Sequence, residues 1–206
     1  MKEYSYHIPK TEHGMKTFKK IIETGKTLFA INGFLATSIN HIIEEADVAA
    51  GTFYIYFDNK LALYNYLLDY YRISIRHAAN ESIKGLTSRY DMEREGLKAF
   101  IEYVYEDSLA YKLIWESLFV DENTFKEYYI SFSESYVHNL QKAVNKGEIK
   151  KDFDLETLSY VLMGISNFVG LQVLFKDKIT DEEIDRIVDQ AMKTITEGVF
   201  TNQKNT

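Results

Sequence analysis

The chain has 206 residues, of which 46% are hydrophobic and 27% are charged, a composition typical of globular rather than disordered proteins. It contains no cysteine, which excludes a disulfide scaffold, a thiolate metal site and a cysteine nucleophile. The formal net charge of −7 argues against a protein that coats nucleic acid with a uniformly basic surface.

The N-terminal residues lack the apolar segment of a signal peptide. The least charged stretch, residues 157–175, has 19 residues, close to the roughly 20 that a bilayer span needs. Because it contains several Ser, Thr, Asn and Gln side chains, we interpret it as a helix buried on most sides in a soluble protein. We therefore expect a cytoplasmic protein with no membrane partner.

The first part of the chain predicts an arm and three helices. Residues 1–14 are polar, contain the chain's single proline, and are interpreted as a flexible N-terminal arm. A helix is expected over 15–32, where apolar residues recur with helical spacing and a glycine follows. Thr37 or Ser38 then caps a short second helix, and a tight turn leads to a third helix over about 49–56.

The remaining residues also predict helices, several of which begin at a capping residue or end at a glycine. Thr180 is followed three residues later by Glu183, the spacing of a capping box. No segment alternates between polar and apolar residues as a series of strands would. We expect an all-α fold of about nine helices, the later ones over about 59–84, 91–105, 108–120, 124–146 and 155–175 and from 181.

Residues 37–60 carry the most informative pattern, a helix, a three- to four-residue turn and a second helix. The outward side chains of the second helix are small or capable of hydrogen bonding, which suits entry into the roughly 12 Å wide major groove. Gly51 permits close backbone approach, Thr52 can contact a base edge, and Tyr, Thr and Lys side chains can reach phosphates. We expect DNA contacts from Thr37, Ser38, Ala49, Ala50, Gly51, Thr52, Tyr54, Tyr56 and Lys60.

This segment resembles the DNA-binding domain of the TetR/AcrR family of bacterial transcriptional regulators. The matching positions include Gly33-Phe34, Thr37, Ile42, Ala46, Val48, Gly51-Thr52-Phe53-Tyr54, Tyr56-Phe57 and Asn59-Lys60. The resemblance implies a homodimer in which a helix-turn-helix domain, residues 15–60, binds half of a double-stranded DNA operator. It also implies that residues 61–206 form a ligand-binding and dimerisation domain.

Three departures from the family pattern matter for the expected attraction to DNA. Ala50 and Asp58 stand where basic residues are frequent, and Leu61-Ala62 replaces a frequently acidic pair. Residues 1–60 hold seven lysines and seven acidic residues, so their net charge is zero. We therefore expect the DNA affinity to depend less steeply on salt concentration than that of a lysine-rich DNA-binding domain.

The C-terminal part is rich in aromatic residues, most of which belong in a core, although some can line a pocket between helices. Such a pocket suits an elongated lipophilic effector. One candidate is an acyl chain, because residues 111–136 resemble regulators of fatty-acid or acyl-thioester metabolism in the same family; another is a lipophilic cation near Glu116. The expected ligand-binding residues are Tyr103, Trp115, Phe119, Tyr136, Asn167, Phe168 and Leu171.

The late helices are the expected dimer surface. Ser166 and Gly170 are small and four residues apart, so two backbones can approach closely there. A two-fold dimer places two recognition helices about one DNA turn apart, as a palindromic operator requires. The expected interface residues are Leu162, Ser166, Val169, Gly170, Val173, Ile184, Val188 and Ile195.

The alternatives are a helical-bundle enzyme and an adaptor that does not bind DNA. His77 and Glu81 are four residues apart, as are Glu134 and His138, whereas a di-iron bundle uses Glu-x-x-His. Gly-rich phosphate loops, zinc-protease pairs and nucleophile elbows are absent from the sequence. We thus expect no catalytic residue, metal or cofactor, and a repressor that a small effector releases from DNA.

Overall fold

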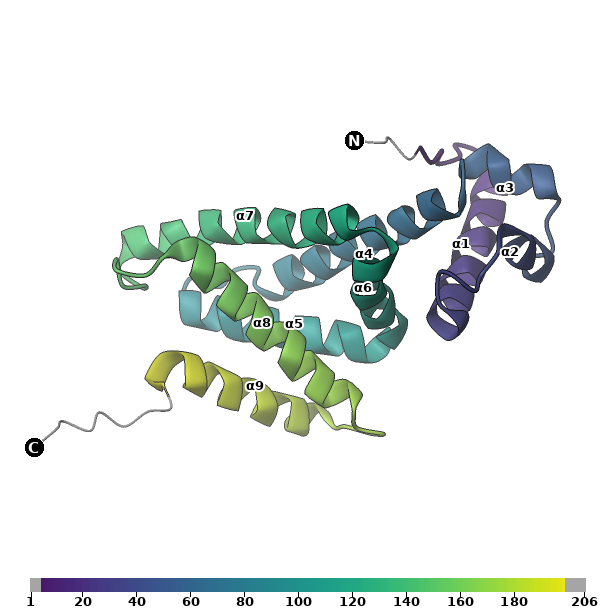
Figure 1. The fold of residues 1–206 in the computed structure, drawn as a ribbon. Coiled ribbons are helices and arrows are strands. Elements are labelled where there is room, and N and C mark those ends of the chain that lie inside the picture. The colour runs from purple at the N-terminus through teal and green to yellow at the C-terminus, as the bar shows by residue number, and fades with distance from the viewer. Residues whose placement is uncertain (1–4, 199–206) are drawn as a thin grey trace, which may run out of the picture. The chain divides into compact units, whose positions relative to one another are not determined.

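The computed structural model describes residues 5–198, and over this range the chain is all-α, as expected (Figure 1). Within that range, regular structure other than helix is limited to an isolated β-bridge between Tyr6 and Phe57. The part of the chain that the structure describes contains nine helices: α1 Glu12–Asn32, α2 Ile39–Glu45, α3 Ala50–Tyr56, α4 Lys60–Ser82, α5 Arg89–Glu106, α6 Ser108–Val120, α7 Glu122–Lys146, α8 Leu155–Leu174 and α9 Asp181–Glu197.

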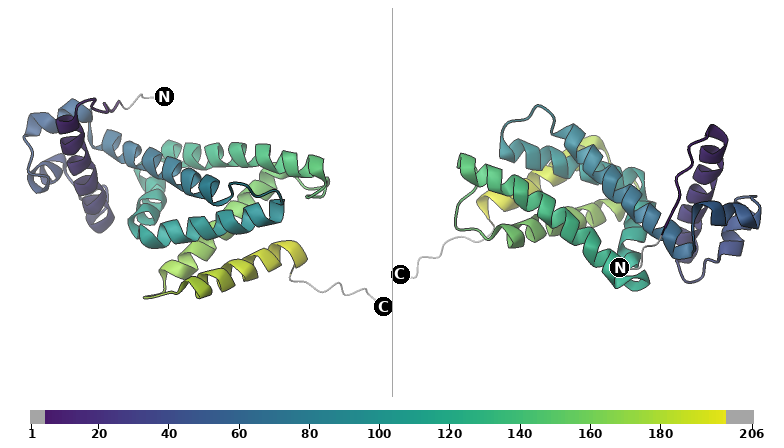
Figure 2. Two further views of the ribbon diagram at one scale, coloured as in Figure 1. Left: turned by 180° about the vertical axis from the view of Figure 1, so that it is seen from behind. Right: turned by 90° about the horizontal axis from the view of Figure 1, so that it is seen from above.

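The first of two compact units comprises residues 1–74 and 108–130. It contains α1, α2, α3 and α6, with the beginnings of α4 and α7. Helices α1, α2 and α3, drawn in purple to dark blue, lie together in both views of Figure 2, and α1 packs against α2 and α6. Their core is built from fully buried aromatic and aliphatic side chains, including Phe18, Phe29, Ile42, Phe53 and Phe57.

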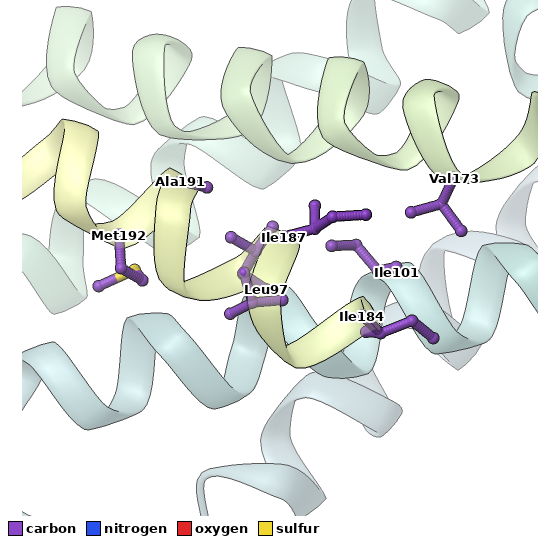
Figure 3. Close-up of a cluster of buried hydrophobic side chains, with 8 residues drawn as sticks. Leu97, Ile101, Val173, Ile184, Ile187, Ala191 and Met192 are labelled. Atoms are coloured by element: carbon purple, nitrogen blue, oxygen red, sulfur yellow. The ribbon is translucent and has the colours of Figure 1, made fainter. Parts of the chain in front are cut away.

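The second unit comprises residues 75–107 and 131–206, and its core lies between α5, α8 and α9. The apolar stripe of α9 points into this core, where it meets α5 and α8 (Figure 3). The expected capping box is present, because the Thr180 side chain accepts from the Glu183 backbone and the Glu183 carboxylate accepts in return. The cluster consists of Leu97, Ile101, Val173, Ile184, Ile187, Val188, Ala191 and Met192.

The N-terminal region differs from its expected form. Helix α1 begins at Glu12 rather than at residue 15, because the Thr11 side chain caps it by accepting a hydrogen bond from the Gly14 backbone. Residues 5–9 of the expected arm lie against the helices, with Tyr6 paired to Phe57. The first compact unit continues past residue 60 to residue 74 of α4 and also takes in α6 and the start of α7.

Helix α8 corrects the interpretation of residues 157–175. By length and composition it is the one helix within 5–198 that reaches the threshold for a membrane span, which alone is weak evidence for one. We expected α8 to be buried on most sides, but only 22% of its apolar 18-residue stretch is buried within the chain. The expectation is wrong for the single chain, and α8 leaves a largely apolar face uncovered.

Candidate nucleic-acid interface

The α2–α3 segment forms a helix-turn-helix whose inner face is apolar. Ser38 caps α2 by accepting a hydrogen bond from the His41 backbone at 3.1 Å. The turn after α2 contains Asp47, which has a positive φ of 45°, and the Val48 backbone donates to the Ile43 carbonyl at 3.2 Å. Phe53 of α3 is fully buried, so packing fixes which face of α3 remains outward.

The outward face of α3 is slim at its N-terminal end. Ala49, Ala50 and Gly51 are exposed, and a Cβ at Gly51 would have no heavy atom within 4 Å. Thr52 is half-buried beside them, whereas Tyr54 is 55% exposed. This face can approach another backbone closely and presents hydroxyl groups at its margin.

Ile55 belongs to the same exposed surface and was missed from the sequence. Its side chain is 61% exposed next to Tyr54, although an isoleucine in a short helix is ordinarily predicted to be buried in the core. The signal that could have found it is its place two residues after Phe53 and two before Phe57, both of which are fully buried. An exposed aliphatic side chain here can contact a thymine methyl group.

Two expected DNA contacts are instead buried. Thr37 is 1% exposed, and its hydroxyl donates to the carbonyls of Leu28 and Gly33 at 3.2 and 2.8 Å. Tyr56 packs edge-on against Phe18, with ring centroids 5.4 Å apart, and is buried. Within the chain, both side chains therefore have structural roles, Thr37 in the α1–α2 turn and Tyr56 against α1.

Lys60 also has a structural role that the sequence did not reveal. Its ammonium group donates to the carbonyls of Phe34 and Thr37 at 2.6 and 2.7 Å and lies 4.2 Å from the centroid of the Phe34 ring. Partial burial lowers the pKa of Lys60, and the negative charge of Glu116 opposes that shift. In the chain without DNA, the ammonium group therefore binds the α1–α2 turn.

Glu116 of α6 also binds the α1–α2 turn. Its Oε1 accepts from the Phe34 backbone N–H at 2.6 Å, and its Oε2 accepts from the Tyr64 hydroxyl at 3.5 Å. Gly33 has a φ of 81°, and a Cβ there would lie 3.0 Å from Oε1, so both backbone conformation and space favour glycine. We call Glu116, Lys60 and the turn at residues 33–37 the turn clasp.

The turn clasp was missed because Glu116 lies 82 residues from Phe34 in sequence. The sequence suggested that Glu116 attracts a lipophilic cation, but its carboxylate faces the α1–α2 turn. Hydrogen bonds to charged groups contribute roughly 1.5–3 kcal/mol each to stability. The clasp is therefore an energetically significant connection between α6 and the helix-turn-helix.

The expected ligand-binding residues have different environments. Phe119 and Phe168 are 84% and 66% exposed, which does not suit a closed pocket in the single chain. The Tyr136 hydroxyl donates to Glu93, which pairs with Arg89, and burial followed by the Glu93 charge raises the pKa of Tyr136. Tyr136 is half-buried, and so are the remaining four: Tyr103, Trp115, Asn167 and Leu171.

The expected dimer surface is largely an intrachain core. Val173, Ile184 and Val188 belong to the buried cluster of the second unit, and Val169 and Ile195 pack against it. Leu162 and Gly170 are also buried, and the Ser166 hydroxyl, half-buried, donates to the Leu162 carbonyl at 3.0 Å. Exposed apolar side chains instead follow the opposite face of α8 and its end, and we call this the α8 stripe: Tyr160, Val161, Phe168 and Phe175.

These features define a class of protein, namely an all-α protein with an N-terminal helix-turn-helix. Residues 21–67 match the family model described as bacterial regulatory proteins, tetR family. The helix-turn-helix and the start of α4 therefore have the sequence of a TetR-family DNA-binding domain.

Comparison with individual proteins agrees with this classification. The chain is 34% identical over 94 residues, 46% of its length, to YuxN of Bacillus subtilis, named an uncharacterised HTH-type transcriptional regulator; the match spans only 31% of YuxN. A TetR-family regulator from Syntrophomonas wolfei has a TM-score of 0.77 at 22% identity, covering 91% of this chain and 98% of that one. Bacillus subtilis FadR, solved with stearoyl-CoA, has a TM-score of 0.74 at 17% identity, covering 89% and 100%.

Proposed function

We propose that this protein is a cytoplasmic transcriptional repressor that binds a palindromic DNA operator as a homodimer and is released by a small lipophilic effector. The observation that carries the proposal is the slim, exposed N-terminal face of α3, which follows a capped α2 across a tight turn. A helix presented in this way enters the major groove with its N-terminal residues toward the base edges.

The proposed DNA surface keeps the expected residues that are accessible and adds one. Gly51 allows the backbone to approach the bases, and Thr52 and Ile55 supply a hydroxyl and a methyl surface for base contact. Tyr54 reaches a phosphate through its hydroxyl. The full set is Ser38, Ala49, Ala50, Gly51, Thr52, Tyr54 and Ile55.

The homodimer is proposed to form through the α8 stripe rather than through the residues first expected. The stripe presents large apolar side chains to solvent, whereas those of α9 lie buried against α5 and α8. Self-association would remove this apolar surface from water and gain the associated free energy. A two-fold axis at α8 supplies the second α3 that a palindromic operator needs.

An acyl-chain compound is the proposed effector. The FadR neighbour was solved with stearoyl-CoA, and the half-buried Tyr103 and Leu171 of the second unit offer apolar surface to such a chain. A lipophilic cation is less favoured, since the carboxylate suggested for it belongs to the turn clasp. The effector and DNA prefer different conformations of the dimer, so each weakens binding of the other.

The test is a selection of bound duplexes from a random library, followed by fluorescence anisotropy with the enriched duplex and added stearoyl-CoA. We expect an enriched palindrome, weaker binding by Tyr54→Phe, and release by stearoyl-CoA. Tyr90→Phe is the matched control, because Tyr90 is exposed on α5 in the other unit. Failure to enrich any duplex would reject the proposed function, whereas enrichment without release would reject the effector class alone.

A further inference from the structure

The N-terminal segment before α1 is tied to the end of the recognition helix. The His7 backbone N–H donates to the Tyr56 carbonyl at 2.8 Å, and the Asp58 N–H donates to the Ser5 carbonyl at 3.4 Å. These bonds flank the antiparallel bridge between Tyr6 and Phe57. We call residues 5–9 the N-terminal strap.

The Tyr6 side chain extends the connection to α4. Its ring meets Tyr66 edge-on at 5.1 Å, and its hydroxyl donates to Asp69 at 3.4 Å. Burial, followed by the charge of Asp69, raises the pKa of Tyr6. Tyr66 in turn packs edge-on against Phe18 and Phe57, with centroids 5.1 and 6.0 Å away. Tyr6 therefore contacts the α3–α4 connection through its backbone and α4 through its ring.

The other end of the strap lies close to α1. A Cβ at Gly14 would lie 2.9 Å from both the Pro9 Cβ and the Thr11 Oγ1, so the strap passes close to the first turn of α1. The Tyr56 hydroxyl would lie 3.6 Å from the same point. The strap thus contacts α4 through Tyr6, bonds to the end of α3, and passes close to the first turn of α1.

This placement matters because α3 ends at Tyr56 and α4 begins at Lys60. The short connection between them sets the direction of α3, and the strap bonds to residues on both sides of Phe57. We propose that the N-terminal strap, through Tyr6, is a positioning element that holds the recognition helix in its DNA-binding direction. The inference rests on the proposed function, since it concerns the orientation of α3 on DNA.

The physical reason is preorganisation. A connection free to change direction must be ordered when α3 enters the groove, and that ordering subtracts from the binding free energy. The strap orders the connection in the free protein by a bridge and an aromatic contact. Loss of the Tyr6 ring should therefore weaken DNA binding by leaving the connection less ordered.

The experiment compares Tyr6→Ala, Tyr6→Phe and His7→Ala in the full chain, using a duplex selected with the wild-type protein. His7 is the matched control, because its side chain is exposed and its bond to Tyr56 uses the backbone. Affinity is measured by anisotropy at a temperature where circular dichroism shows every variant fully folded. Hydrogen exchange of residues 56–58, compared with that of α5 and α9, reports on the strap directly.

We expect Tyr6→Ala to bind the duplex about five- to tenfold more weakly and to exchange the Asp58 amide faster, with α5 and α9 unchanged. Tyr6→Phe should remain within about twofold of the wild type, because the ring and the bridge are kept and the lost bond is long. His7→Ala should match the wild type. Equal affinity of Tyr6→Ala and the wild type would overturn the inference, whereas a wild-type protein that enriches no duplex would reject the proposed function itself.

Discussion

Replacing Gly51 with alanine should stabilise the free protein and weaken its binding to DNA. The added methyl group would meet no heavy atom within 4 Å, so it introduces no clash into α3. Glycine within a helix costs about 0.5–1 kcal/mol relative to alanine. At about 2–4 °C per kcal/mol for a chain of this length, the melting temperature should rise by roughly 1–4 °C.

The effect on DNA binding should have the opposite sign. If the α3 backbone approaches base edges at Gly51, a methyl group there must displace it from the groove. A loss of about 1.4 kcal/mol of binding free energy corresponds to a tenfold larger dissociation constant. We expect an effect of about this size for the selected duplex, measured by anisotropy alongside differential scanning calorimetry of the free protein.

Gly96 in α5 provides the matched control. It also lies inside a helix, and its Cβ would meet Ile83 at an ordinary 3.9 Å. Gly96→Ala should raise the melting temperature by a similar amount without changing DNA affinity. If Gly51→Ala binds the duplex as tightly as the wild type does, the close approach of α3 to the bases is refuted.

Three further predictions concern the turn clasp, Thr37 and the α8 stripe. Glu116→Ala should lower the free energy of unfolding in urea by about 1–3 kcal/mol, because it leaves the Phe34 N–H without its acceptor, whereas Glu116→Gln keeps an acceptor and should cost less. Thr37→Val should cost about 1–2 kcal/mol through its lost hydroxyl bonds, and should leave the salt dependence of DNA binding unchanged. Phe168→Asp should shift the protein toward monomer in analytical ultracentrifugation, because it places a charge in the α8 stripe.

Each of these predictions has a result that would contradict it. Equal losses from Glu116→Ala and Glu116→Gln would show that the acceptor on Phe34 is not what matters. If the DNA affinity of Thr37→Val depends less steeply on salt concentration than that of the wild type, Thr37 does contact a phosphate. For the stripe, Phe153→Asp is the control, since Phe153 is exposed outside α8. Dimerisation that survives Phe168→Asp unchanged would place the interface elsewhere.

The parts of the fold that depend on neighbouring residues were predictable from the sequence. Ser38 caps α2 and Thr180 caps α9 because each needs only a backbone N–H three residues away. Gly33 ends α1 with a positive φ, as a glycine after a helix suggests. The small, exposed residues at the start of α3 could also be recognised, since buried Phe53 fixes the facing of so short a helix.

The parts that depend on distant residues were not predictable. Lys60 has the charge that suits a phosphate contact. The fold, however, places the carbonyls of Phe34 and Thr37 beside its ammonium group, which donates hydrogen bonds to both. The apolar stripe of α9 indicates burial without saying whether α5 of the same chain or a second subunit covers it. Helix α8 is apolar on most sides, so its sequence does not show which face the α9 contact leaves open.

The central claim is that the exposed face of α3 reads the sequence of duplex DNA. Its most direct test is to sequence the duplexes that the wild type and Thr52→Ala each retain from a random library at low ionic strength. The account predicts that the wild type enriches a palindrome with half-site centres about 10 base pairs apart, or a multiple of that spacing, and that Thr52→Ala changes the preferred base at one symmetric position. The same enriched sequence for both proteins, or none for the wild type, would contradict it.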